Sequence, residues 1–196
     1  MRDTDKERGN EMDNTVEAKT VNGKTVRIVW DPDPESPREW DNLGTMVCWH
    51  RRYNLGDKSA SEQFRTPQEF DERPGQSSSD VVLPLFLYDH SGLHMKVGSF
   101  QGLLPQGHAE FDSMQVGYIF VTAEKLRSEY GWKKITAKRH AEAIKYLEAE
   151  VSTYDDFLSG QVYGYEVEDA EGDLVDSCYG IYGLAAAREE AERAVA

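Results

Sequence analysis

The sequence predicts one domain of the α+β class, with a mostly antiparallel sheet and two or three packed helices. The chain has 196 residues, of which 39% are hydrophobic and 11% aromatic, enough for a single core. Segments with the alternation of strands come before, between and after segments with helical periodicity. Short turns join most of them, and that order favours antiparallel pairing over alternating strands and helices.

Three regions of the chain differ in composition. Residues 1–14 are charged and hold almost nothing to bury, so we predict a disordered tail. Residues 15–183 contain the strand and helix patterns and are predicted to form the single domain. Residues 184–196 are alanine-rich and weakly amphipathic, and we predict a helix that packs loosely there.

The first predicted hairpin is centred on Asn22-Gly23, a pair that favours a type I′ turn. Alternating apolar residues continue on both sides of this pair. The segment that follows holds three prolines, at positions 32, 34 and 37. Because proline has no amide donor, this segment is predicted to be an extended loop rather than a strand.

The stretch DNLGTMVCWHRRYNLGDK, residues 41–58, carries two copies of Asn-Leu-Gly around an apolar run. The run predicts a buried, central strand with Cys48 in the core, because both of its faces are apolar. The two glycines are predicted to allow positive φ angles in turns at its ends.

Further strands are predicted over 81–88, 93–97 and 115–122, and a last hairpin over 161–183. Pro84 indicates an edge position or a bulge in the first of these strands. Three threonines precede helical patterns and are predicted N-caps: Thr66, Thr122 and Thr136. The helix after the third has an apolar stripe that extends to residue 158.

Charge is the strongest bulk property of the chain. The net charge is -14, from 36 acidic and 22 basic residues. Such a chain repels nucleic acid and anionic membranes on average, so we expect neither as a partner and instead expect a basic protein surface. Six acids without a base lie in EVEDAEGDLVD, residues 166–176. The predicted partner-binding residues come from this cluster: Glu166, Glu168, Asp169, Glu171 and Asp173.

Histidines and aspartates offer a second kind of site. The candidate metal ligands are Asp41, His50, Asp89 and His90, and the last three are also the candidate catalytic residues. Carboxylates and imidazoles suit transition metals, although no established ligand spacing is matched. Cys48 and His50 lie two apart, so on a strand they would share a face. A cysteine in an apolar strand is more typical of core than of a nucleophile, so we favour the structural interpretation.

Several function classes lack their sequence signals. The nucleotide-binding, zinc-protease and hydrolase motifs do not occur in the chain. We expect no cofactor and favour binding over catalysis. The N-terminal residues form no signal-peptide pattern and no apolar run is long enough to span a membrane, so we predict a cytoplasmic protein.

Four segments in order resemble a family of small uncharacterised proteins encoded by phages and other mobile elements: NLGTMVCWHRRYNLGD, PLFLYDHSG, QVGYIFVT and DSCYGIYG. The resemblance covers roughly residues 30–183 and implies an accessory gene product that acts inside the host cell. It implies no reaction and no catalytic residue.

Three functions follow as hypotheses. The first is an accessory protein that binds a basic surface of a host or viral protein through the acidic cluster. Its sharpest form is a DNA-mimic inhibitor of a host defence system, in which carboxylates take the place of phosphates. The second is a metal-dependent enzyme built on the aspartate and histidine set. The third is a structural or regulatory viral protein without a catalytic role, whose acidity serves only solubility.

Overall fold

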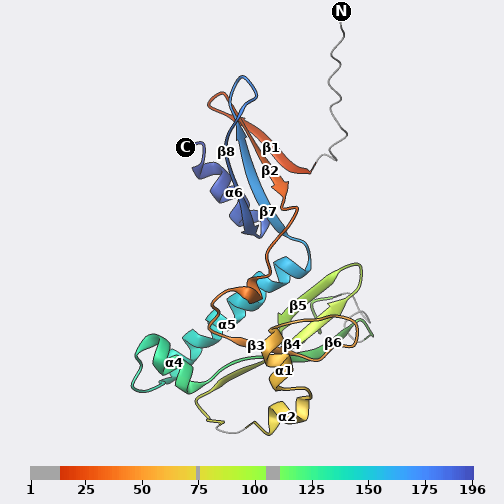
Figure 1. The fold of residues 1–196 in the computed structure, drawn as a ribbon, viewed down its shortest axis with the longest axis vertical. Helices are drawn as coiled ribbons and strands as arrows, with labels where there is room; N and C mark the ends of the chain where they lie inside the picture. Colours follow the sequence, from red (N-terminus) through yellow and green to blue (C-terminus); the bar gives the residue numbers. More distant parts are fainter. Residues whose placement is uncertain (1–13, 74–75, 105–110) are drawn as a thin grey trace, which may run out of the picture. The chain divides into compact units, whose positions relative to one another are not determined.

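Two four-stranded antiparallel sheets, each with its own helices, form the protein (Figure 1). The computed structural model describes residues 14–73, 76–104 and 111–196. The predicted tail falls almost wholly outside the described residues. The α+β class and the antiparallel pairing are confirmed, but the strands are divided between two sheets rather than gathered in one. The chain divides into two compact units: unit 1, residues up to 34 and from 161 on, and unit 2, residues 35–160.

The sheet of unit 1 joins the two ends of the chain. Its strand order is β1-β2-β7-β8, where the strands are β1 (Thr15–Val21), β2 (Lys24–Trp30), β7 (Val162–Glu168) and β8 (Leu174–Tyr182). The predicted turn between the first two is confirmed, since Asn22 has φ 52° and Gly23 has φ 79°. The last predicted hairpin, β7–β8, is likewise present.

Helix α6 (Leu184–Arg193) covers one face of this sheet. Ala187 and Ala191 are buried against a core that includes Val26, Ile28 and Val167. The predicted C-terminal helix is therefore present, but it is packed through a buried stripe rather than loosely. Alanine side chains are small, so the helix backbone can approach the sheet closely and bury that stripe.

The sheet of unit 2 has the order β3-β6-β4-β5. Its strands are β3 (Thr45–Cys48), β4 (Val81–Asp89), β5 (Leu93–Val97) and β6 (Ser113–Val121). Strand β4 is interior, and its register with β6 shifts between Leu85 and Phe86, so Pro84 lies beside a bulge and not at an edge. Strand β3, predicted to be central, lies at the edge of the sheet.

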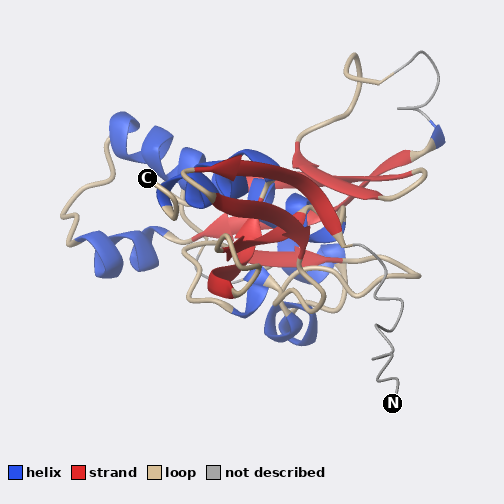
Figure 2. Ribbon diagram, turned by 90° about the horizontal axis from the view of Figure 1, so that it is seen from above, coloured by secondary structure: helices blue, strands red, loops and turns tan. Residues whose placement is uncertain are grey.

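Within the described residues of unit 2, helical segments accompany the sheet, and Figure 2 distinguishes them from the strands by colour. They are η1 (Pro37–Glu39), α1 (Lys58–Gln63), α2 (Pro67–Asp71), α4 (Ala123–Tyr130) and α5 (Ala137–Leu158). The three predicted threonine caps each accept an amide of the first helical turn. Three residues of the predicted stripe of α5 are buried against the sheet: Leu147, Val151 and Tyr154. Ala143, which lies outside the predicted stripe, is buried with them.

A buried cation ties three distant segments of unit 2 together. The side chain of Arg38 is 4% exposed. Its guanidinium donates to both carboxylate oxygens of Asp57, at 2.7 and 3.1 Å, and to Glu150 of α5 at 3.0 Å. A further N–H of Arg38 donates to the Gly44 carbonyl at 2.8 Å. Burial opposes the charge of Arg38, but the two carboxylates outweigh it and hold its pKa above the ordinary value.

Both Asn-Leu-Gly copies donate backbone amides to side chains of α5, next to this network. The amides of Leu43 and Gly44 donate to Glu150 at 2.8 and 3.1 Å, and the amide of Gly56 donates to the Tyr154 hydroxyl at 3.1 Å. Gly56 has φ 73°, as predicted. Gly44 has no positive φ: it is needed for space, because a Cβ there would lie 2.5 Å from Leu147.

We expect Arg38→Met to destabilise unit 2 by roughly 3–5 kcal/mol, because it leaves two carboxylates without their cation in a desolvated place. Urea unfolding followed by tryptophan fluorescence and far-UV circular dichroism measures the loss. The matched control is Arg188→Met, which removes the exposed pair with Glu17 in unit 1. It should leave the unfolding midpoint near that of the unchanged chain. Equal midpoints for Arg38→Met and the unchanged chain would contradict the structural role of the network.

Candidate functional site

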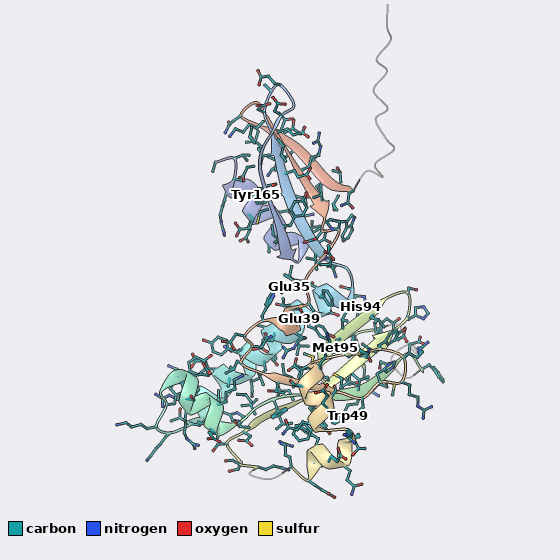
Figure 3. The ribbon with its side chains drawn as sticks, viewed as in Figure 1. Glu35, Glu39, Trp49, His94, Met95 and Tyr165 are labelled. Atoms are coloured by element: carbon teal, nitrogen blue, oxygen red, sulfur yellow. The ribbon has the colours of Figure 1, made fainter. Side chains whose placement is uncertain are left out.

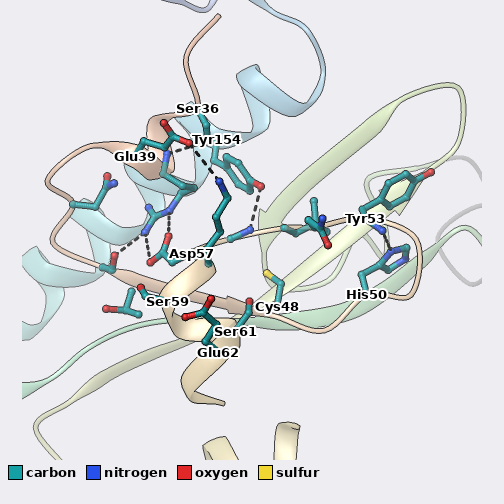
Figure 4. Close-up of a pocket in the computed structure, with 18 of the residues that line it drawn as sticks. Ser36, Glu39, Cys48, His50, Tyr53, Asp57, Ser59, Ser61, Glu62 and Tyr154 are labelled. Atoms are coloured by element: carbon teal, nitrogen blue, oxygen red, sulfur yellow. Dashed lines mark hydrogen bonds and ion pairs between the residues drawn. The ribbon is translucent and has the colours of Figure 1, made fainter. Parts of the chain in front are cut away.

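An open groove of about 1350 Å³ lies on unit 2 (Figure 4). Its walls come from η1, from the segment that leaves β3 and from α1. Arg38 and Asp57 belong to its lining, so the buried network is part of its floor. A concavity of this size that contains charged side chains is the first place to look for chemistry.

The charges in this groove are mixed. Lys58 lies 4.0 Å from Glu39, and Lys125 donates to the carbonyl of Asn42 at 2.7 Å. Glu62 and Arg65 add one charge of each sign. Such a surface creates no strong field of either sign, so it does not favour phosphate or a metal cation on electrostatic grounds.

Cys48, whose thiol lies in the groove lining, does not have the environment of a nucleophile. Cys48 is 7% exposed, and burial, reinforced by the charge of Asp57, raises the pKa of its thiol to about 12. The strand ends at Cys48, so the alternation that would have placed Cys48 and His50 on one face does not continue. The prediction that Cys48 belongs to the core is confirmed.

His50 stabilises a turn. Its Nδ1 accepts the amides of Arg52 and Tyr53, both at 3.3 Å, and its ring stacks on that of Tyr53 with centroids 4.9 Å apart. Asp41 and His50 both line the groove, but Asp89 and His90 do not. Asp89 instead accepts hydrogen bonds from Arg52 and Tyr53.

The predicted metal and catalytic set is therefore not assembled. His90 lies 3.4 Å from Asp112, and His94 lies 3.4 Å from Asp155 of α5, beside Met95 (Figure 3). Among the residues that the structure describes, no three of His, Cys, Asp and Glu converge on a point where a metal ion could sit. The hypothesis based on Asp41, His50, Asp89 and His90 failed because a sequence does not show which turn each of them serves.

The acidic β7–β8 hairpin of unit 1 carries charges of one sign, unlike the groove of unit 2, where both signs occur. Two of its carboxylates belong to the sheet: Glu168 forms an ion pair with Arg27 of β2, and Glu166 accepts the hydroxyl of Tyr179. The bond to Glu166 is the main reason that the pKa of Tyr179 is raised to about 12.

Three further acids form the tip of the hairpin. Asp169 closes the turn, since its Oδ1 accepts the amides of Glu171 and Asp173 at 3.1 and 2.9 Å. Glu171 and Asp173 are exposed, and within the described part of the chain neither side chain forms an ion pair. The five predicted partner-binding residues thus divide into three with structural bonds and two that only face solvent.

The sequence patterns did not indicate Tyr179 or the outer side of β8 as parts of this surface. Tyr179 lies over Gly164, where an added Cβ would come within 2.4 Å of the tyrosine ring. The pairing of an exposed aromatic with a glycine on the neighbouring strand is a signal that the sequence contains, but only the strand register brings the two together.

In the described part of the chain, no helix has both the length and the apolarity that a membrane span requires.

We expect the two cysteines to differ sharply in reactivity. Cys178 is exposed and Cys48 is buried. In native protein, Ellman's reagent near pH 8 should modify one thiol quickly and the second only after denaturant is added, because the thiolate is the reacting species. Cys178→Ser should leave no fast thiol. Rapid modification of Cys48 in the folded Cys178→Ser protein would contradict its assignment to the core.

Comparison with known proteins gives no relative. No family model matches the chain, and no curated protein and no solved structure matches it either. The resemblance to proteins of phages and mobile elements therefore stays a prediction.

Proposed function

We propose that this chain is a binding protein that engages a basic surface of another protein through its acidic β7–β8 hairpin, residues 166–176. The observation that carries the proposal is the concentration of charge. Residues 161–196 hold nine acidic and two basic side chains, half of the net charge of the whole chain. Charge of one sign on one hairpin steers a partner of the opposite sign and raises its rate of association.

The hairpin also has the rigidity that a recognition surface needs. Tyr179 and Arg27 hold Glu166 and Glu168 in place, and Asp169 fixes the turn. Glu171 and Asp173 extend from that turn into solvent. A surface ordered before binding loses less conformational entropy when the partner arrives.

The biological setting belongs to the same proposal. An accessory protein of a phage or mobile element that carries a rigid row of carboxylates can occupy the DNA-binding groove of a host defence protein, because such grooves attract phosphates by the same electrostatics. The metal-dependent alternative has less support, because among the described residues no three candidate ligands converge on one point.

The test reverses the charges that have no structural role. Glu171→Lys with Asp173→Lys should weaken binding to a partner recovered from host lysate at low salt and then purified. We expect a loss of about ten-fold or more, and a shallower dependence of the dissociation constant on salt. Reversing Glu166, Glu168 and Asp169 is less informative, because their bonds support the hairpin itself.

The matched control is Glu142→Lys with Glu148→Lys, two exposed positions on α5 that change the net charge equally. It should retain the affinity of the unchanged chain. Equal loss in both double variants would show that total charge matters and the hairpin does not. Full affinity in the hairpin variant would refute the proposal.

A further inference from the structure

The outer edge of β8 is an unpaired strand edge. The order β1-β2-β7-β8 places β8 last, and no other described element pairs with its outer side. Every residue from Leu174 to Gly180 is exposed. Leu174 and Val175 are 59% and 51% exposed, and Tyr179 is 44% exposed. Such an edge presents backbone donors and acceptors together with apolar side chains.

The other three edge strands are each protected. At β3, the amide of Met46 donates to the Asp57 carboxylate and its carbonyl accepts the Asp57 amide. At β5, the amide of Met95 donates to Asp155 of α5 at 2.7 Å. Strand β1 carries Lys19 near its centre, a charge that commonly discourages pairing. Strand β8 has no lysine, arginine or proline. The amide of Gly180, near the end of the strand, donates to the Asp31 carboxylate at 2.8 Å, but the stretch from Leu174 to Tyr179 lacks these protections.

The register shows which amides of β8 face outward. The carbonyl of Val162 accepts an amide from the β2 side, so by alternation Tyr165 and Val167 face β8. Their partners are Cys178 and Asp176, which therefore face β7. The amide that lies between them alternates to the open side, and it belongs to Ser177. Val175 is the extra residue of a bulge, where this alternation is interrupted.

Charge decides what can pair there. A second copy of β8 would bring its own acidic hairpin against the first, and the like charges would repel. A strand with basic residues meets carboxylates on both faces of the ladder. Asp176 shares a face with Val167 and accepts the hydroxyl of Tyr165, whereas Glu166 points to the other face.

We propose that β8 binds its partner by strand addition. The occupant is an extended segment in which lysine or arginine alternates with apolar residues. Its backbone bonds to the outward amide of Ser177, and its cations meet the acids of the hairpin. This inference rests on the proposed function and names the mode of binding.

The test uses a defined peptide of about nine residues in which lysine alternates with valine. A second peptide has the same sequence but is methylated at three consecutive central amides, so both of its edges lose donors while its charge is unchanged. Fluorescence anisotropy should show at least about ten-fold tighter binding of the first peptide. Equal affinities, or no binding of either peptide, would overturn strand addition.

The matched protein variants are Ser177→Pro and Ser177→Ala. Proline removes an outward amide of an edge strand without removing a bond to β7, so it should weaken binding of the lysine–valine peptide at least about ten-fold. Alanine should leave binding unchanged. If Ser177→Pro binds the peptide as well as the unchanged chain does, strand addition is wrong.

Hydrogen exchange of the unchanged chain keeps the test valid if the proline variant folds poorly. Peptide binding should slow exchange at the amide of Ser177 and leave those of Asp176 and Cys178 as they were. The assignment would be overturned if peptide binding slowed exchange only at amides outside β8. It would also be overturned if the chain formed a concentration-dependent dimer that pairs through β8. Failure of these tests leaves the proposed function standing, because the charge reversal at Glu171 and Asp173 tests it on a folded partner.

Discussion

Unit 2 is organised around the guanidinium of Arg38. It is a cation withdrawn from water, and such a charge is tolerated only where carboxylates and hydrogen bonds replace its hydration. Asp57 comes from the segment after β3 and Glu150 from α5, so the three side chains join parts of the chain that are far apart in sequence. The Asn-Leu-Gly copies provide the amides and the close backbone approach that complete the network.

This network also explains why the groove beside it offers few free reactive groups. Asp57 and Glu150 are occupied by Arg38, Cys48 is desolvated and His50 supports a turn. An active site needs groups whose protonation or reactivity is available to a substrate. The polar groups in the groove's floor instead stabilise the fold, so its volume alone does not indicate catalysis.

The two units use their charges differently. In unit 2 the central carboxylates face a cation and the edge strands are covered by Asp57 and Asp155. In unit 1 the hairpin acids and the edge of β8 stay exposed. Both features are unfavourable for an isolated chain, because like charges repel one another and an open edge invites unwanted pairing. Their combination on one hairpin is the basis of the proposed binding surface.

Local features of this protein could be predicted from the amino-acid sequence. Asn22-Gly23 specified a turn, three threonines specified helix starts, and the spacing of apolar residues from Leu147 to Tyr154 specified the buried face of α5. These signals act over a few residues, where backbone conformation and capping decide the outcome.

The identity of the edge strands and of the neutralised charges depended on the three-dimensional fold. The continuous apolar run of β3 predicted a central strand, because both of its faces are apolar. An edge strand covered by a loop shows the same pattern, and β3 is such a strand. Likewise, Glu168 and Glu171 look alike in sequence, but the strand register brings only Glu168 to Arg27. Pairing between distant segments depends on the whole arrangement of the chain, and no local pattern of residues encodes it.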